Sequence, residues 1–134
     1  MAKYTLELDS EQAHALVKAL DFYSLMGMHQ FEEIASFMRW NGQWDLREVN
    51  TGVKLRAVER ACDELKRAAG HEPNSCYGIT CPEVPKVCKV CYDLECVLRQ
   101  QVARIEKYHK MSTWHHDPMH IVSDVPLAKC TVEE

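Results

Sequence analysis

The hydrophobic and polar positions of the chain follow two different periods, and the first of them predicts a strand. Residues 3–8 alternate, with Tyr4, Leu6 and Leu8 on one side and polar residues between them. A period of two is typical of a strand with one buried face. We therefore predict a strand over 3–8, and its open edge needs a second strand to pair with it.

A helical pattern follows directly after this strand. Apolar residues recur at steps of three and four, and they keep their phase through Gly27. Asp9 is suited to the N-cap, and Gln12, three residues later, completes a capping box. The sequence predicts one helix over about 10–39, or two helices that share a face and break at Gly27.

Two further helices and an extended tail are predicted in the rest of the chain. The first is expected over 47–69, because Gly70 stands where a C′ glycine belongs. The second is expected over 84–109, because Pro85 suits a first helical turn. Residues 118–134 are expected to be extended and to pair with the first strand. On a helical wheel, the apolar stripe of the last helix consists of Val84, Val87, Cys91, Leu94, Leu98, Val102 and Ile105, with Asp93 and Cys96 on the polar side.

These elements together predict a mainly α (α+β) fold over residues 1–134. It would be a single domain of three to four amphipathic helices with a small terminal β-sheet. The hydrophobic fraction of 46% and the charged fraction of 27% are typical of a globular protein. A formal net charge of −4 argues against general nucleic-acid binding. No apolar run is long enough for a membrane span and no signal core is seen at the start, so we expect a cytoplasmic protein.

The seven cysteines are the first candidates for chemistry. In a reducing compartment they are expected as thiols or metal ligands rather than as disulfides. Cys76, Cys81, Cys88 and Cys91 are one candidate set of zinc ligands. Against this reading, Cys91 falls at the centre of an apolar helix stripe, where a cysteine packs like a small hydrophobic residue. We therefore expect no metal and no cofactor, and the zinc site remains the alternative.

An aromatic turn is the leading candidate for binding. Trp40 and Trp44 flank an Asn-Gly turn, with Arg39 and Arg47 beside them. Such a surface stacks a base or anchors a partner, and the alternative is that the rings cover the end of the helical bundle. The candidate ligand-binding residues are Arg39, Trp40, Trp44, Arg47, Tyr77, His116 and His120.

Catalytic chemistry has one candidate segment. His115, His116, Asp117 and His120 crowd a short stretch that could hold a metal or act as acid and base. Pro118 makes the stretch a turn without a helical ligand frame, so solvated loop histidines are the alternative. No phosphate-binding glycine loop or Gly-x-Ser-x-Gly nucleophile motif is present. We assign no catalytic residue and favour a protein that is not an enzyme.

Eight segments, in order along almost the whole chain, carry a resemblance to a known family. They are LELDSEQA at 6–13, DFYS at 21–24, MGMHQFEEI at 26–34, SCYGI at 75–79, PEVP at 82–85, YDL at 92–94, DPMH at 117–120 and PLA at 126–128. In these segments the chain resembles a family of small uncharacterised proteins of tailed bacteriophages. The resemblance implies a phage accessory protein that acts in the host bacterial cytoplasm, and it implies no activity.

The expected function is therefore that of a non-enzymatic phage accessory protein that counters bacterial defence. Its expected partner is a nucleotide-derived small molecule, which it would sequester, or a host defence protein. A homo-oligomer is expected because a long amphipathic helix offers a surface for a symmetric interface. The alternatives are a small metal-dependent hydrolase and a structural phage component.

Overall fold

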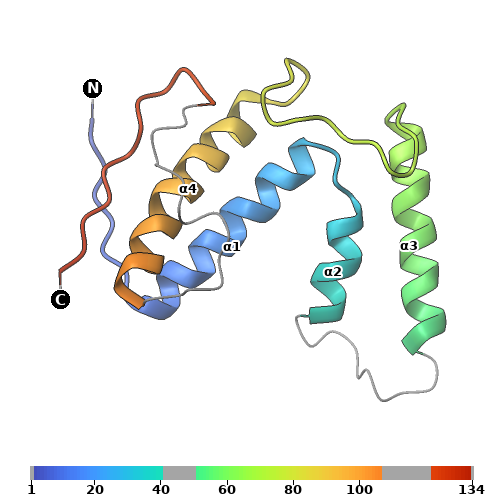
Figure 1. The fold of residues 1–134 in the computed structure, drawn as a ribbon, viewed down its shortest axis with the longest axis horizontal. Helices are drawn as coiled ribbons and strands as arrows, with labels where there is room; N and C mark the ends of the chain where they lie inside the picture. Colours follow the sequence, from blue (N-terminus) through green and yellow to red (C-terminus); the bar gives the residue numbers. More distant parts are fainter. Residues whose placement is uncertain (1, 41–50, 107–121, 134) are drawn as a thin grey trace. The chain divides into compact units, whose positions relative to one another are not determined.

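The computed structural model describes residues 2–40, 51–106 and 122–133 of the 134-residue chain. These residues contain four helices, which are α1 (Ser10–Gly27), α2 (Glu32–Trp40), α3 (Thr51–Ala68) and α4 (Lys86–Glu106) (Figure 1). The same residues contain no strand. The prediction of a mainly helical protein is thus confirmed, and the β part of the prediction is not supported.

The predicted terminal sheet needs correction at both of its ends. Residues 3–8 have no strand structure, and no strand occurs over 122–133. Alternation favours a strand only when one face is covered, but Tyr4 is 95% exposed and Leu6 is 70% exposed. With no apolar layer to cover them, these side chains do not stabilise a strand. Residues 118–121 of the predicted tail lie outside the described part.

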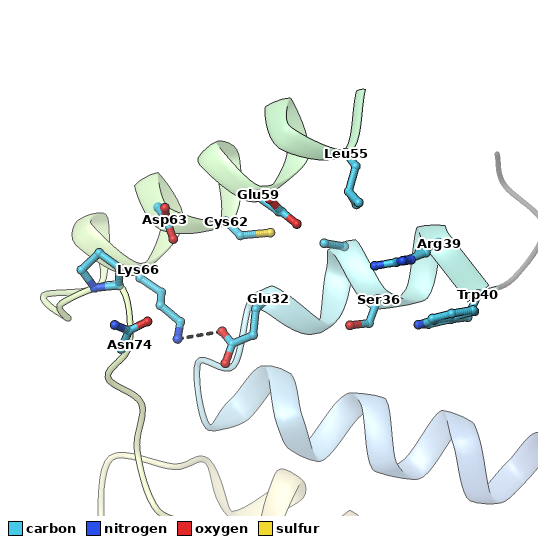
Figure 2. A pocket seen from close by; sticks show the side chains of 12 residues that line it. Glu32, Ser36, Arg39, Trp40, Leu55, Glu59, Cys62, Asp63, Lys66 and Asn74 are labelled. Carbon is cyan, nitrogen blue, oxygen red and sulfur yellow. Dashed lines mark ion pairs between the residues drawn. The ribbon is translucent and has the colours of Figure 1, made fainter. Parts of the chain in front are cut away.

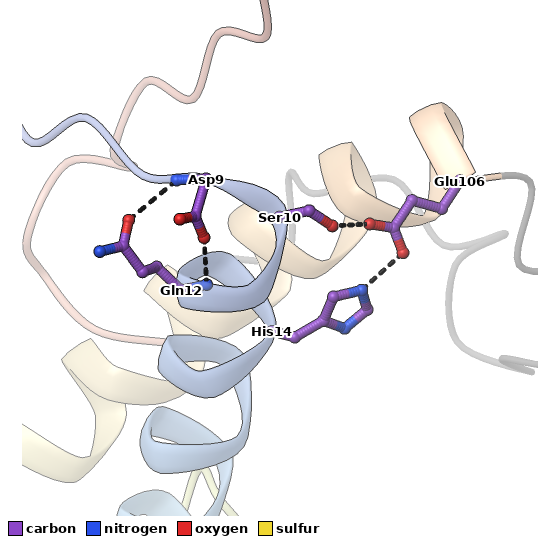
Figure 3. A network of polar contacts seen from close by, with 5 residues as sticks. All are labelled: Asp9, Ser10, Gln12, His14 and Glu106. Carbon is purple, nitrogen blue, oxygen red and sulfur yellow. Dashed lines mark hydrogen bonds and ion pairs between the residues drawn. The ribbon is translucent and has the colours of Figure 1, made fainter.

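The start of α1 confirms the predicted capping box. The Gln12 main-chain N–H donates to Asp9 Oδ1 over 2.8 Å, and the Asp9 N–H donates to Gln12 Oε1 over 3.0 Å (Figure 3). Two of the otherwise unsatisfied N–H groups at the helix start are satisfied in this way. The exchange fixes the helix start at Ser10.

The end of α1 corrects the prediction of one long helix over 10–39. The Gln30 N–H donates to Leu25 O over 3.0 Å and the His29 N–H donates to Met26 O over 3.1 Å, which is a Schellman ending. His29 takes the left-handed position with φ of +61°. The predicted break at Gly27 is confirmed, although the left-handed residue is a histidine and not the glycine; that the two helices share a face stays a prediction.

The same kind of ending closes α3. The His71 N–H donates to Lys66 O over 2.9 Å, the Gly70 N–H donates to Arg67 O over 3.0 Å, and Gly70 has φ of +86°. Gly70 is therefore the C′ residue, as predicted. The predicted helix start at 47–50 lies outside the described residues.

The last helix begins two residues later than the predicted range of 84–109. Pro85 stands directly before Lys86, the first residue of α4. A proline there leaves no helical N–H unsatisfied, because it has none. The predicted end at 107–109 falls outside the described residues.

The chain divides into two compact units, one formed by residues 1–24 and 86–134 and the other by residues 25–85. In the first unit, α1 and α4 run antiparallel, because Ser10 and His14 near the start of α1 both contact the Glu106 carboxylate at the end of α4 (Figure 3). The prediction of a single domain stays a prediction.

In the second unit, α2 packs against α3. The small side chains of Ala35 and Cys62 are buried, with 7% and 3% of their surfaces exposed. Because both residues are small, the two helices can approach closely. Within the described residues, no helix combines the length and the apolar character that a membrane crossing requires.

Candidate functional site

A pocket of about 510 Å³ lies along α2 and α3 in the second unit (Figure 2). Its volume falls in the range of about 300–1,000 Å³ that is typical of small-molecule sites. All of its lining residues belong to the unit formed by 25–85. They are Glu32, Ala35, Ser36, Arg39, Trp40, Leu55, Glu59, Cys62, Asp63, Lys66, Pro73 and Asn74.

One end of the pocket is formed by Arg39 and Trp40, at the end of α2. The guanidinium carbon of Arg39 lies 4.9 Å from the centroid of the Trp40 ring, which is a cation–π contact. The tryptophan is 69% exposed and the arginine is also exposed. An aromatic face and a forked hydrogen-bond donor are thus both accessible to a ligand.

The other end is closed by a buried lysine. Lys66 is 2% exposed, and its Nζ lies 2.7 Å from Glu32 Oε2 (Figure 2). The pair joins α3 to the first turn of α2, where a carboxylate is also favoured by the helix dipole. A buried ammonium group is costly unless it is paired, so Glu32 is fixed in place by Lys66.

Acidic side chains line the wall contributed by α3. Glu59 and Asp63 are one helical turn apart, with Cys62 beside them (Figure 2). Burial raises the pKa of the Cys62 thiol. A hydrogen bond with the Ala35 backbone lowers it, and the carboxylates of Asp63, Glu32 and Glu59 each raise it. The thiol therefore stays protonated next to a wall of negative potential.

The acidic wall and the buried lysine were missed at the sequence level, although a signal was present. Glu59, Cys62, Asp63 and Lys66 have helical spacings of three and four, which place them on one face. Polar residues at such spacing are normally assigned to a solvated face. The α2 surface that covers them here could be located only in three dimensions.

The predicted binding residues do not all lie at the same place. Arg39 and Trp40 line the pocket, while Tyr77 lies in a separate cluster of rings. The remaining four predictions fall outside the described residues, and they are Trp44, Arg47, His116 and His120.

That cluster brings the endings of α1 and α3 together. His29 Nδ1 and His71 Nε2 are 3.0 Å apart, and the Tyr77 ring lies 4.8 Å and 4.5 Å from the two imidazoles. The Phe31 ring stacks on His29 at 5.2 Å. The Tyr77 N–H donates to Met28 O over 2.9 Å, which fastens the loop after α3 to the turn after α1.

The cysteine zinc alternative gains no support. The described residues include all seven cysteines, and none of them forms a disulfide; Cys76 is exposed, whereas Cys88 is buried. Across the described ranges, no group of three or more His, Cys, Asp or Glu side chains is placed to hold a metal ion. The prediction that the cysteines are not paired in disulfides is confirmed, and the expectation that they bind no metal stays a prediction.

No family model, curated protein or solved structure matches the chain.

Proposed function

We propose that this protein is a small-molecule binding protein whose pocket along α2 and α3 takes a nucleotide-derived ligand. The observation that carries the proposal is the meeting of Arg39 and Trp40 at one end of a pocket of about 510 Å³. A planar base stacks on a tryptophan or a guanidinium group, and a phosphate accepts hydrogen bonds from the forked arginine donors. The remaining lining supplies hydrogen-bond partners for a sugar.

The wider biological setting is part of the same proposal. The segments that resemble proteins of tailed bacteriophages support a phage accessory role in the host bacterial cytoplasm. There the protein would sequester a nucleotide-derived signal of bacterial defence without converting it. A homo-oligomer remains part of this proposal as a prediction.

A thermal-shift screen followed by calorimetry tests the binding. Nucleosides, nucleoside monophosphates, ADP-ribose derivatives and cyclic dinucleotides are added to the full chain, and a bound ligand raises Tm by mass action. We expect at least one member to bind. We expect the Trp40→Ala and Arg39→Ala variants to lose most of that binding, about tenfold or more, since each removes an anchoring group.

Matched controls are available in exposed side chains outside the pocket. Tyr4→Ala removes an exposed aromatic ring, and Arg60→Ala removes an exposed arginine of α3. Both should bind the ligand like the original chain. The proposal fails when no compound in the screen shifts Tm, or when the controls lose as much binding as the pocket variants.

The non-enzymatic part has its own measurement. The ligand is recovered after incubation with the protein, and its molecular mass is measured by mass spectrometry. We expect an unchanged mass, and conversion to a product would overturn sequestration while leaving the binding site in place.

A further inference from the structure

The charges around the pocket are unevenly balanced. The lining includes three carboxylates, Glu32, Glu59 and Asp63, and two cations, Arg39 and Lys66. Lys66 is committed to Glu32 over 2.7 Å. In the part of the chain that the structure describes, Glu59 and Asp63 form no ion pair. Among the described lining residues, this leaves Arg39 as the cation without an ion pair, and Glu59 and Asp63 as the two carboxylates without one.

This balance decides what kind of nucleotide the pocket admits. We propose that the pocket selects a nucleoside that carries at most one phosphate, with the phosphate at Arg39 and the sugar hydroxyls at Glu59 and Asp63. The inference rests on the proposed nucleotide-binding function and narrows its ligand class. Dinucleotides and nucleoside polyphosphates are disfavoured by the same side chains.

The placement follows from the geometry of the lining. Arg39 and Trp40 lie together at the end of α2, so a base stacked there has its phosphate within reach of the guanidinium group. The carboxylates of Glu59 and Asp63 extend from α3, the opposite wall (Figure 2). A carboxylate accepts two hydrogen bonds from neighbouring hydroxyls, as sugar diols offer. It repels a second phosphate.

The size of the repulsion makes the selection measurable. Two like charges about 8 Å apart, at an effective dielectric constant of about 40, lower a binding constant roughly fivefold. The two or three additional charges of ATP should therefore weaken binding by more than about tenfold relative to AMP. High salt should reduce this difference, because the groups are close to solvent.

Calorimetry with adenosine, AMP and ATP, without divalent cations and at low salt, tests the inference. We expect AMP to bind at least as tightly as adenosine, and ATP to bind more than about tenfold more weakly than AMP. In the Glu59→Gln, Asp63→Asn double variant, we expect the gap between AMP and ATP to fall to about threefold or less, because the amides still accept hydrogen bonds but carry no charge.

Glu64→Gln is the matched control, since Glu64 is an exposed carboxylate of α3 outside the pocket lining. It should keep the full gap. Circular dichroism of each variant confirms that the helices remain.

The outcomes separate this inference from the function on which it rests. ATP that binds as tightly as AMP, or a gap that survives in the double variant, overturns the charge selection and leaves nucleotide binding intact. Failure of adenosine, AMP, ATP and the wider screen to bind overturns both.

Discussion

In α4, Arg99 Nε lies 3.1 Å from Glu95 Oε1, and the Glu95 side chain is only 3% exposed. Burial raises the pKa of Glu95 to about 7. Arg99 lowers this pKa and Asp21 of α1 raises it, which leaves burial as the dominant cause. The pair is thus an ionisable element inside the unit formed by residues 1–24 and 86–134.

This raised pKa predicts that stability falls as the pH rises. The folded state holds the proton of Glu95 up to a pH of about 7, whereas the unfolded chain releases it near its ordinary pKa of 4.5. The stabilisation is complete below pH 4.5 and is lost by pH 7, and above pH 7 the loss is constant. The shift corresponds to about 3 kcal/mol. Urea unfolding between pH 4.5 and 8 measures it.

Glu95→Gln should flatten this profile, because glutamine has no proton to release. Glu11→Gln, which changes an exposed carboxylate of α1, should leave the profile unchanged. A Glu95→Gln profile as steep as the original would show that other groups cause the pH dependence.

Asp93→Asn should release the chain after residue 121 from α4. Asp93 accepts three hydrogen bonds, from the Val122 and Ser123 N–H groups over 2.9 Å each and from Ser123 Oγ over 2.7 Å. The asparagine loses the charge and turns an N–H toward donors, which we expect to cost about 2–3 kcal/mol of unfolding free energy. Hydrogen exchange at 122 and 123 should become faster.

Ser123→Ala is the graded control for this contact. It removes the Ser123 Oγ donor to Asp93 and the weak acceptor of the Val125 N–H at 3.3 Å, and it keeps the two main-chain donors to Asp93, so a loss of about 1 kcal/mol is expected. An equal effect of the two substitutions would contradict the carboxylate as the anchor.

Asp93 also illustrates how far the sequence could be interpreted. The helical stripes, the Asp9–Gln12 capping box and the C′ glycine Gly70 predicted the helices, because these signals depend on neighbours within one or two turns. The wheel placed Asp93 on the polar side of the last helix, yet it is 5% exposed. Its burial depends on N–H groups of a segment 29 residues away, which no local pattern reports.

The pocket shows the same limit. The aromatic turn indicated Arg39 and Trp40, because two tryptophans so close to a turn are hard to bury completely. Lys66 and Glu32 could not be paired from sequence, since they are on different helices. The strand predicted over residues 3–8 was wrong for a related reason. The local apolar alternation was present, but whether another part of the chain covers it cannot be inferred from a local pattern.

The two facing histidines predict a shifted titration in the second unit. Burial lowers the pKa of His29, and the neighbouring His71 lowers it further. His71→Phe keeps a ring against Tyr77 and removes the second charge, so the pKa of His29 should rise toward its ordinary value. Imidazole signals in NMR spectra recorded from pH 4 to 8 measure this change.

The lowered pKa of His29 also makes the stability of the folded protein depend on pH. Since the folded pKa of His29 is lower than 6.5, its contribution to stability is present above pH 6.5 and is lost as the pH falls toward the folded value. In His71→Phe this loss should be smaller. An unchanged His29 titration in the variant would show that His71 has no electrostatic effect on it.

Substitutions of Lys66 and of Glu32 should change the free energy of unfolding by different amounts, because Lys66 is buried and Glu32 is half-exposed. Glu32→Gln leaves the ammonium group of Lys66 buried without an opposite charge, and such losses are large, although Glu32 is 53% exposed and solvent reduces the cost. Lys66→Met removes the buried charge and keeps the length of the side chain, which is often neutral for stability. We expect Glu32→Gln to lower the unfolding free energy by about 1–2 kcal/mol, and Lys66→Met to change it by less than about 1 kcal/mol. Urea unfolding of both variants at pH 7 checks the order. A larger loss in Lys66→Met would mean that the ion pair itself, and not the burial of an unpaired charge, determines the stability of the α2–α3 contact.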